Sequence, residues 1–450
     1  MNENIKFLYN NWLLQGGKWK SPYHDIAFST SKRPRSNMAN LLLDCGLISR
    51  AADLIEEASA HEILLAKAKL EFLRGNHVKS TNYLLEVLDE KNNSAQKRRA
   101  IRLLTRVSPE DMIAWLERHD EQQLLCRINA VTQQVSNAEI LLTSRSGDDH
   151  LLVSNSLLRS TEKLYRLNDL WREMHLAPLP IPSNESAFDI NYFPVSERVL
   201  ASDDSHNNNV SVVMTVHNGA AYLKSSILSI LNQLNVEIEL IVVDDGSTDD
   251  TWKIIEKIKN LHPKRVRCIR LANNVGTYRA KNLALPMCRY EYMAFQDADD
   301  WSHPERLFRA ISWLRASKSN VAVTCRYVRL SEEGSFYSPA VWPIRQWSPN
   351  TLVMRRKEIL DNIGGFDTVA VGADTDYFER IRAVFGDSRI KFQQEVMLVA
   401  MGLSTSLMHN KFTGVSANGY SSKRIAYREE SAERILSAVR GSPQLIRLPY

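Results

Sequence analysis

The stretch Leu240-Ile241-Val242-Val243-Asp244-Asp245-Gly246-Ser247 joins a continuous apolar run to two carboxylates and a turn of small residues. A second stretch repeats this arrangement, because Tyr292-Met293-Ala294-Phe295 leads through Gln296 into Asp297-Ala298-Asp299-Asp300. Buried parallel strands are continuous apolar runs, and ligands of open α/β sheets bind at the carboxyl ends of such strands. The two acidic clusters are therefore predicted to meet at the ligand-binding edge of one sheet. Paired carboxylates beside small residues suit a hard divalent cation that also holds a diphosphate, which indicates chemistry on a nucleotide-activated substrate.

The composition is that of a folded protein with more than one domain. The chain has 450 residues, of which 44% are apolar and 24% charged, and this length predicts two domains. A net charge of +5 is too small to indicate nucleic-acid binding. The five cysteines form no CxxC pair, and their odd number favours a reduced, cytoplasmic protein. We expect neither a membrane span nor a signal peptide, because Asn10, Asn11 and Gln15 interrupt the first apolar segment.

The pattern of apolar residues is helical before about residue 200. Helical spacing is interrupted once by Gly75 and then resumes, which predicts a helix–Gly–helix hairpin similar to a tetratricopeptide unit. An irregular helical bundle is the alternative to such a solenoid-like domain. The expected division is a helical domain over 1–185 and a polar linker over 186–209. The apolar positions of the hairpin are Ile63, Ala66, Leu70 and Leu73 before Gly75, and Tyr83, Leu84, Val87 and Leu88 after it.

The second half of the chain alternates strand-like and helical segments. Such alternation predicts a mainly parallel sheet, in an α/β domain over 210–415 that is followed by a lid and a helix over 416–450. The expected strands are Val210–Val216, Leu240–Val243, Val266–Leu271, Tyr292–Phe295 and Val321–Val328, and the expected helices are Tyr222–Asn232, Thr251–Asn260, Tyr278–Leu285 and Pro304–Ala316.

Five ordered landmarks in this half resemble those of the family 2 glycosyltransferases. They are Val212–Asn218, Val242–Asp249, Asn274–Gly276 with Ala280–Asn282, Gln296–Trp301, and Gly364–Asp367. The resemblance covers about residues 208–410 and leaves out the helical domain. It implies the Rossmann-like GT-A fold, a nucleoside-diphosphate sugar as donor, Mn²⁺ or Mg²⁺ as cofactor, and inversion at the anomeric carbon.

The resemblance also implies the residues that bind the donor. Thr215, His217 and Asp245 match the nucleotide-base pocket, in which Asp245 accepts a ring N–H and His217 stacks, although His217 also fits an ordinary loop histidine. Asp297 matches the ribose contact and Asp299 the metal ligand, with Lys281 where the family usually has arginine. The remaining residues of the predicted donor site are Asn218, Gly276 and Gly365.

Inverting transfer needs a general base for the acceptor hydroxyl. The family places an aspartate after a glutamate at the start of a helix, and Asp374 matches that position, but Ala373 replaces the glutamate. Asp376 is therefore a rival base. In the structural alternative, both aspartates only cap a helix over Tyr377–Val384, whose dipole favours anions at that end.

Further residues of the site are expected near the end of the family segment. His409 matches a position where many members have a second metal ligand, and a structural histidine is the alternative. The basic stretch from Lys411 to Arg428 predicts a lid over the diphosphate, to which Lys411, Lys423 and Arg424 would contribute, or else a surface loop. The helix expected over Ile425–Val439 is basic and amphipathic, so it either packs on its own domain or lies on an anionic membrane.

These features predict a cytoplasmic, metal-dependent glycosyltransferase. It would move a sugar from a UDP-sugar to a bacterial surface glycan such as capsule or lipopolysaccharide, free or lipid-linked, and its helical domain would bind the acceptor or a protein partner. One alternative is a GT-A-like nucleotidyltransferase that releases pyrophosphate. The other is an inactive scaffold, which Ala373 favours and the intact Asp297/Asp299 pair opposes.

Overall fold

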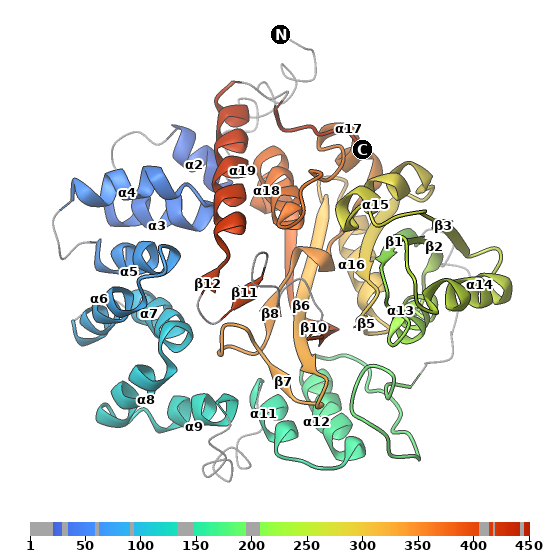
Figure 1. Cartoon of the computed structure of the whole chain (residues 1–450), viewed down its shortest axis with the longest axis horizontal. Helices are drawn as coiled ribbons and strands as arrows, with labels where there is room; N and C mark the ends of the chain where they lie inside the picture. Colours follow the sequence, from blue (N-terminus) through green and yellow to red (C-terminus); the bar gives the residue numbers. More distant parts are fainter. Residues whose placement is uncertain are drawn as a thin grey trace.

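The computed structural model describes residues 21–28, 35–58, 63–90, 94–132, 147–194, 208–404, 414–416, 419–441 and 445–450. The first half of the chain is helical and the second half is built on one large sheet. Figure 1 shows the early helices as a curved row along one side of the molecule, facing the sheet across the middle.

The helical region consists of short helices that pack on their neighbours in the chain. Gly75 has a φ of +81° between α5 and α6, so the predicted helix–Gly–helix hairpin is confirmed, while its tetratricopeptide nature stays a prediction. Leu84, Leu104 and Leu116 share one apolar cluster that holds the middle of the row together. The helices are α2 (Pro22–Phe28), α3 (Arg35–Cys45), α4 (Ile48–Glu56), α5 (Leu64–Leu73), α6 (His77–Asp89), α7 (Ser94–Val107), α8 (Pro109–Arg118), α9 (Gln122–Val131), α11 (Asp149–Asn155) and α12 (Ser160–Glu173).

The first half of the sheet is parallel, as predicted. Its strands lie in the order β3-β2-β1-β4, and each pairing is parallel. Val212 of β1 packs in the cluster that contains α13, α14 and α16, whereas its neighbour Val213 packs in the cluster that contains α15. The elements are β1 (Asn209–Val216), α13 (Leu223–Leu231), β2 (Glu237–Asp244), α14 (Thr251–Leu261), β3 (Val266–Arg270), α15 (Thr277–Ala284), β4 (Tyr292–Asp297) and α16 (Arg306–Ala316).

The second half of the sheet is mixed, which the prediction of a mainly parallel sheet did not include. From β4 the order continues β9-β6-β10-β5, and only the β6–β10 pairing is parallel. Two short strands, β7 and β8, also pair with β6. The elements are β5 (Asp300–Ser302), β6 (Ala322–Ser331), β7 (Phe336–Tyr337), β8 (Gln346–Trp347), β9 (Val353–Arg355), α17 (Arg356–Asn362), α18 (Ala373–Phe385), β10 (Ile390–Gly402), β11 (Val415–Ser416), β12 (Gly419–Tyr420) and α19 (Ser422–Arg440).

Within the described residues, the helical region packs directly against the α/β region at several places. At the middle of β10, the Trp171 Nε1–H of α12 donates to the Val396 carbonyl at 2.9 Å. At another contact, Arg50 of α4 forms a two-fold ion pair with Glu433 of α19 at 2.5 and 2.8 Å. Phe193, inside the segment expected to be a linker, packs edge-to-face on Trp301. The domain boundaries stay predictions, but the two regions share their apolar cores.

Two helices differ from their predicted bounds in ways that matter for the site. Helix α18 begins at Ala373 rather than Tyr377, because Gly372 adopts a φ of +88° and starts the first turn. Helix α19 begins at Ser422 and buries Ile435 and Leu436, so its apolar side packs on the protein. Within the described ranges, no helix combines the length and apolarity needed to cross a bilayer.

Candidate functional site

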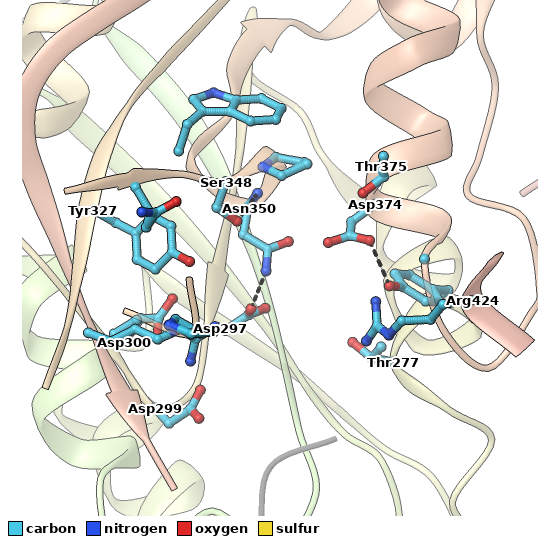
Figure 2. A pocket seen from close by; sticks show the side chains of 18 of the residues that line it. Thr277, Asp297, Asp299, Asp300, Tyr327, Ser348, Asn350, Asp374, Thr375 and Arg424 are labelled. Atoms are coloured by element: carbon cyan, nitrogen blue, oxygen red, sulfur yellow. Dashed lines mark hydrogen bonds between the residues drawn. The ribbon is translucent and has the colours of Figure 1, made fainter. Parts of the chain in front are cut away.

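A cavity of about 810 Å³ opens between the strand ends of the parallel half-sheet and the helices that face them. We call one side the strand-end wall and the other the helical wall. Figure 2 shows Asp297, Asp299 and Asp300 on one side of the cavity, and Asp374 and Arg424 across from them. The strand-end wall consists of Thr215, Lys281, Asp297, Asp299 and Asp300, and the helical wall of Arg106, Asp374, Tyr420, Arg424 and Arg428.

Asp297, the last residue of β4, is held by two donors. Its Oδ1 accepts from Lys281 Nζ at 3.1 Å, and its Oδ2 accepts from Asn350 Nδ2 at 2.6 Å. Lys281 is only 2% exposed and lies over the faces of Phe295 and Phe366. The predicted pair Asp297 and Lys281 therefore lies together in the cavity wall. Asn350, which follows β8 in the chain and belongs to no recognised motif, was missed.

Asp299 and Asp300 make the strand-end wall strongly acidic. Burial, reinforced by the negative charge of Asp297, raises the pKa of Asp299 to about 6. Burial and the charges of Asp299 and Asp297 also raise the pKa of Asp300. A bound cation would relieve this repulsion, and carboxylate oxygens are the donors that Mg²⁺ and Mn²⁺ prefer. The donor set therefore fits a hard divalent cation.

The further metal ligand expected at His409 falls outside the described residues, and so does Lys411. Within the described part of the chain, no three His, Cys, Asp or Glu side chains gather into a metal-binding group. The metal role of Asp299, with His409 as a further ligand, stays a prediction.

Two of the three predicted base-pocket residues, Thr215 and His217, line the cavity at the end of β1, together with the predicted donor-site residue Asn218. The hydroxyls of Thr215 and Thr277 lie 2.8 Å apart, and His217 Nδ1 lies 2.8 Å from the Asp245 carbonyl oxygen. Asn218 has a φ of +52° and accepts from the Thr248 N–H at 2.8 Å, which ties the end of β1 to the turn after β2. Thr277 is a further cavity residue that sequence reasoning missed.

Two other residues of the predicted donor site make contacts with main-chain atoms and do not line the cavity. Asp245 is 3% exposed, and its two oxygens accept from the N–H groups of Val275 and Gly276 at 2.7 and 2.9 Å. The N–H of Gly365 donates to the Leu448 carbonyl at 2.9 Å, and a Cβ there would lie 2.7 Å from the Pro449 oxygen. Neither Asp245 nor Gly365 lines the cavity, so a ligand contact for these two residues stays a prediction.

The two candidate bases on α18 have different surroundings. Asp374 is half-buried, and its Oδ1 accepts from the Tyr278 hydroxyl at 3.0 Å, on the helical wall. Burial and the Asp374 charge raise the pKa of Tyr278, which keeps that hydroxyl protonated as a donor. Figure 2 shows this hydrogen bond as the dashed line below Asp374.

Asp376, one residue beyond Thr375, is 2% exposed and saturated with donors. Its Oδ2 accepts from Arg380 Nε at 2.8 Å, and its Oδ1 accepts from Ser431 Oγ and Arg434 Nη2 at 2.5 and 2.7 Å. These bonds fasten α18 to α19. The bonds of Asp376 are those of a structural residue, and the choice of Asp374 over Asp376 as the base stays a prediction.

The predicted lid residues Lys423 and Arg424 both lie in the first turn of α19. Arg424 lines the cavity, whereas Lys423 is exposed and does not. The Arg424 N–H donates to the Ser421 hydroxyl that caps the helix, at 3.4 Å.

Comparison with known proteins identifies the segment that carries most of this site. Residues 211–378 match the model of the Glycosyl transferase family 2. This segment is a family 2 glycosyltransferase domain. The predicted resemblance is confirmed, and the matched range includes both the strand-end wall and Asp374. The family 2 domain does not include Arg106 or α19, which complete the helical wall.

Relatives of the family 2 domain are bacterial glycosyltransferases. The UDP-Glc:alpha-D-GlcNAc-diphosphoundecaprenol beta-1,3-glucosyltransferase of Escherichia coli is 35% identical over 109 residues, which are 24% of this chain and 42% of that protein. The chondroitin synthase of Escherichia coli is 33% identical over 136 residues, which are 30% of this chain and 20% of that protein. The chain thus spans less than half the length of these curated relatives.

Among solved structures, that of S. aureus TarS in complex with UDP-GlcNAc is similar at 18% identity, with 51% of this chain and 71% of that chain covered. The TM-score of 0.38 is too low for this likeness to say more about the site.

Proposed function

We propose that this protein is a metal-dependent, inverting glycosyltransferase that transfers a sugar from a UDP-sugar to a hydroxyl of a bacterial surface glycan. One observation carries the proposal: an acidic turn suited to a cation and diphosphate faces a half-buried aspartate across a single cavity. Such a site has one wall for the leaving nucleotide and another for deprotonation of the acceptor. The family 2 domain over 211–378 supports the same reaction class.

The strand-end wall is the proposed donor side. Thr215, His217 and Asn218 would hold the nucleoside, Asp297 the ribose, and Asp299 a Mn²⁺ or Mg²⁺ ion. When bound, the ion would neutralise the diphosphate as the nucleotide leaves. Lys281 supports the wall by holding the Asp297 carboxylate in place through a hydrogen bond of 3.1 Å. Uridine as the nucleoside is supported by the Escherichia coli relative, whose name specifies UDP-Glc.

The helical wall supplies the proposed general base. Asp374 would take the proton of an acceptor hydroxyl while the oxygen of that hydroxyl bonds to the anomeric carbon and the bond from that carbon to the diphosphate breaks. The Tyr278 hydroxyl holds one carboxylate oxygen at 3.0 Å and so orients the other toward an acceptor. A single displacement without a protein nucleophile inverts the anomeric carbon.

The acceptor is proposed to be a capsule or lipopolysaccharide glycan, free or lipid-linked. The names of the two Escherichia coli relatives support an acceptor of this class. All five cysteines are free thiols, which supports a place in the reducing cytoplasm. The exposed side of the helical row would offer a surface to a protein partner or to the membrane.

A donor panel tests the proposal without knowledge of the acceptor. Release of nucleotide from UDP-, GDP-, dTDP- and CMP-sugars is measured with Mn²⁺ and with chelator, for the wild type, Asp299→Ala and the control Asp361→Ala. The Asp361 carboxylate in α17 is exposed and does not line the cavity. We expect metal-dependent release from one donor, lost in Asp299→Ala and kept in the control. If pyrophosphate were released from a nucleoside triphosphate and a sugar phosphate instead, the protein would be a nucleotidyltransferase.

A further inference from the structure

Arg106 of α7 lies on the helical wall, outside the family 2 domain, with donors that the protein does not use. Its Nε and Nη2 are buried and have no hydrogen-bond partner in the described structure. A buried donor without an acceptor is unfavourable, and more so when it belongs to a charged group. Such a guanidinium at a cavity wall is stabilised as soon as a ligand brings an oxyanion to it.

Two aromatic rings hold this guanidinium in place. Its central carbon lies 4.9 Å from the ring centre of Phe72 in α5 and 5.0 Å from that of Tyr420 in β12. Phe72 is buried, whereas Tyr420 is 37% exposed at the cavity. Contacts with both ring faces stabilise the cation and leave the N–H edge of the planar group for a ligand.

Two more arginines from α19 make this part of the wall positive. Arg424 and Arg428 also line the cavity, and Arg428 donates to the Asp44 carbonyl at 2.6 Å. The Asp44 carboxylate is paired elsewhere, with Lys69 at 2.8 Å. Although burial alone would raise the pKa of the Tyr420 phenol, the charges of Arg106, Arg428 and Arg424 lower it. The surroundings of Tyr420 are thus electropositive despite the acidic wall opposite.

We propose that Arg106, together with Arg424 and Arg428, binds an oxyanion carried by the acceptor, either a phosphate or a sugar carboxylate. The inference rests on the proposed function and names the chemistry of its acceptor. The position supports the acceptor rather than the donor, because Arg106 shares the helical wall with Asp374 whereas the donor diphosphate is expected at Asp299. The helical region would then select the acceptor for the family 2 domain.

Binding of two probes distinguishes the possible sources of the oxyanion. One probe is GlcNAc α-diphosphate with a short alkyl chain, and the other is a glucuronate-containing oligosaccharide without phosphate. Each is titrated by calorimetry into protein already saturated with UDP and Mn²⁺, so that the donor side is filled. We expect one of the two to bind the wild type, and its identity decides between a lipid diphosphate and an acidic glycan.

Three variants assign that binding to Arg106. In Arg106→Gln, which keeps the side-chain stem between the rings, the Kd of the bound probe should rise at least about ten-fold, since hydrogen bonds to a charged group contribute roughly 1.5–3 kcal/mol. Arg106→Lys keeps the positive charge but not the forked guanidinium, so the Kd of the probe should rise less than in Arg106→Gln. Arg99→Gln removes an exposed arginine from the same helix and should bind like the wild type. The UDP affinity should be unchanged in all three.

Several results would overturn the inference. If neither probe bound the wild type, Arg106 would hold no acceptor oxyanion. The same conclusion would follow if Arg106→Gln and Arg99→Gln bound the probe with equal affinity. Loss of UDP affinity in Arg106→Gln would place the residue on the donor side. If the wild type bound a probe through Arg106 but bound no nucleotide, the oxyanion subsite would stand and the proposed function would fail.

Discussion

The two walls of the cavity are built in different ways. Every residue of the strand-end wall comes from the 86 positions between 215 and 300, at or just after strands or on the helix that follows β3. The helical wall joins residues from α7, α18, β12 and α19, which lie more than 300 positions apart at the extremes. The carboxyl ends of neighbouring parallel strands always lie at the same edge of the sheet. The helical wall instead depends on how distant segments of the chain pack together. The first kind of wall shows its chemistry in local sequence, and the second does not.

The largest expected effect is a loss of catalytic rate on substitution of the proposed base on the helical wall, without loss of donor binding at the strand-end wall. Asp374→Asn keeps the size of the side chain but removes the base, so the rate of sugar transfer should fall about 10²- to 10⁴-fold. Initial rates of transfer to a glycan acceptor measure this, with Asp361→Asn as the control. Residual activity within a few-fold of the wild type would remove Asp374 from the reaction.

A second substitution on the same helix should act on stability instead. Asp376→Asn leaves the fully buried Arg380 without its ionic partner, and breaking a buried pair costs about 3–5 kcal/mol. Urea unfolding measures the loss, with Asp374→Asn as the matched comparison that should stay close to the wild type. Equal stability of the two variants would contradict the distinct roles given to the two aspartates.

The stability that His303 gains from its contact with Ala177 of the helical region should depend on pH. Burial lowers the pKa of His303 to about 4, from an ordinary 6.5, while its ring bonds the Ala177 carbonyl at 2.9 Å. The folded state favours the neutral ring. The contribution of His303 to the free energy of unfolding is therefore complete above pH 6.5 and is lost as the pH falls toward 4. The difference corresponds to roughly 3 kcal/mol.

Denaturation of the wild type and His303→Gln between pH 7 and pH 4 tests this expectation. The nearby charges of Glu305 and Arg309 also act on the ring, in opposite directions, and both remain in the variant. The stability of His303→Gln should therefore fall less over this range. Parallel pH profiles would show that His303 does not titrate with unfolding.

The smallest expected effect concerns the attachment of α12 to β10. Trp171→Phe removes the donor to the Val396 carbonyl and some packing against Trp301, which should cost about 1–2 kcal/mol. Thermal unfolding measures it, and Tyr165→Phe on the exposed side of α12 is the control. A loss no larger than in the control would mean that α12 adds little to the stability of the sheet.

Particular residues show what the sequence could predict. Continuous apolar runs place β1, β2 and β4 within three residues of their observed ends, and with them Asp297 and Asp299. The role of Asp245 was harder to predict. A motif gives its position but does not show that its carboxylate accepts hydrogen bonds from two backbone N–H groups. Asn350 and Arg106 carry no local signal at all. Asn350 reaches Asp297 across 53 positions, and Arg106 meets Tyr420 only through tertiary packing.

Calorimetry of UDP with and without Mn²⁺, on the wild type, Asp299→Ala and Asp374→Asn, tests the division of labour between the two walls most directly. We predict that the wild type and Asp374→Asn bind UDP alike and need the metal, while Asp299→Ala loses the metal-dependent part of the affinity. UDP binding by the wild type that is indifferent to chelator, or equal loss of binding in both variants, would contradict a donor side at the strand ends and a base on the opposite wall.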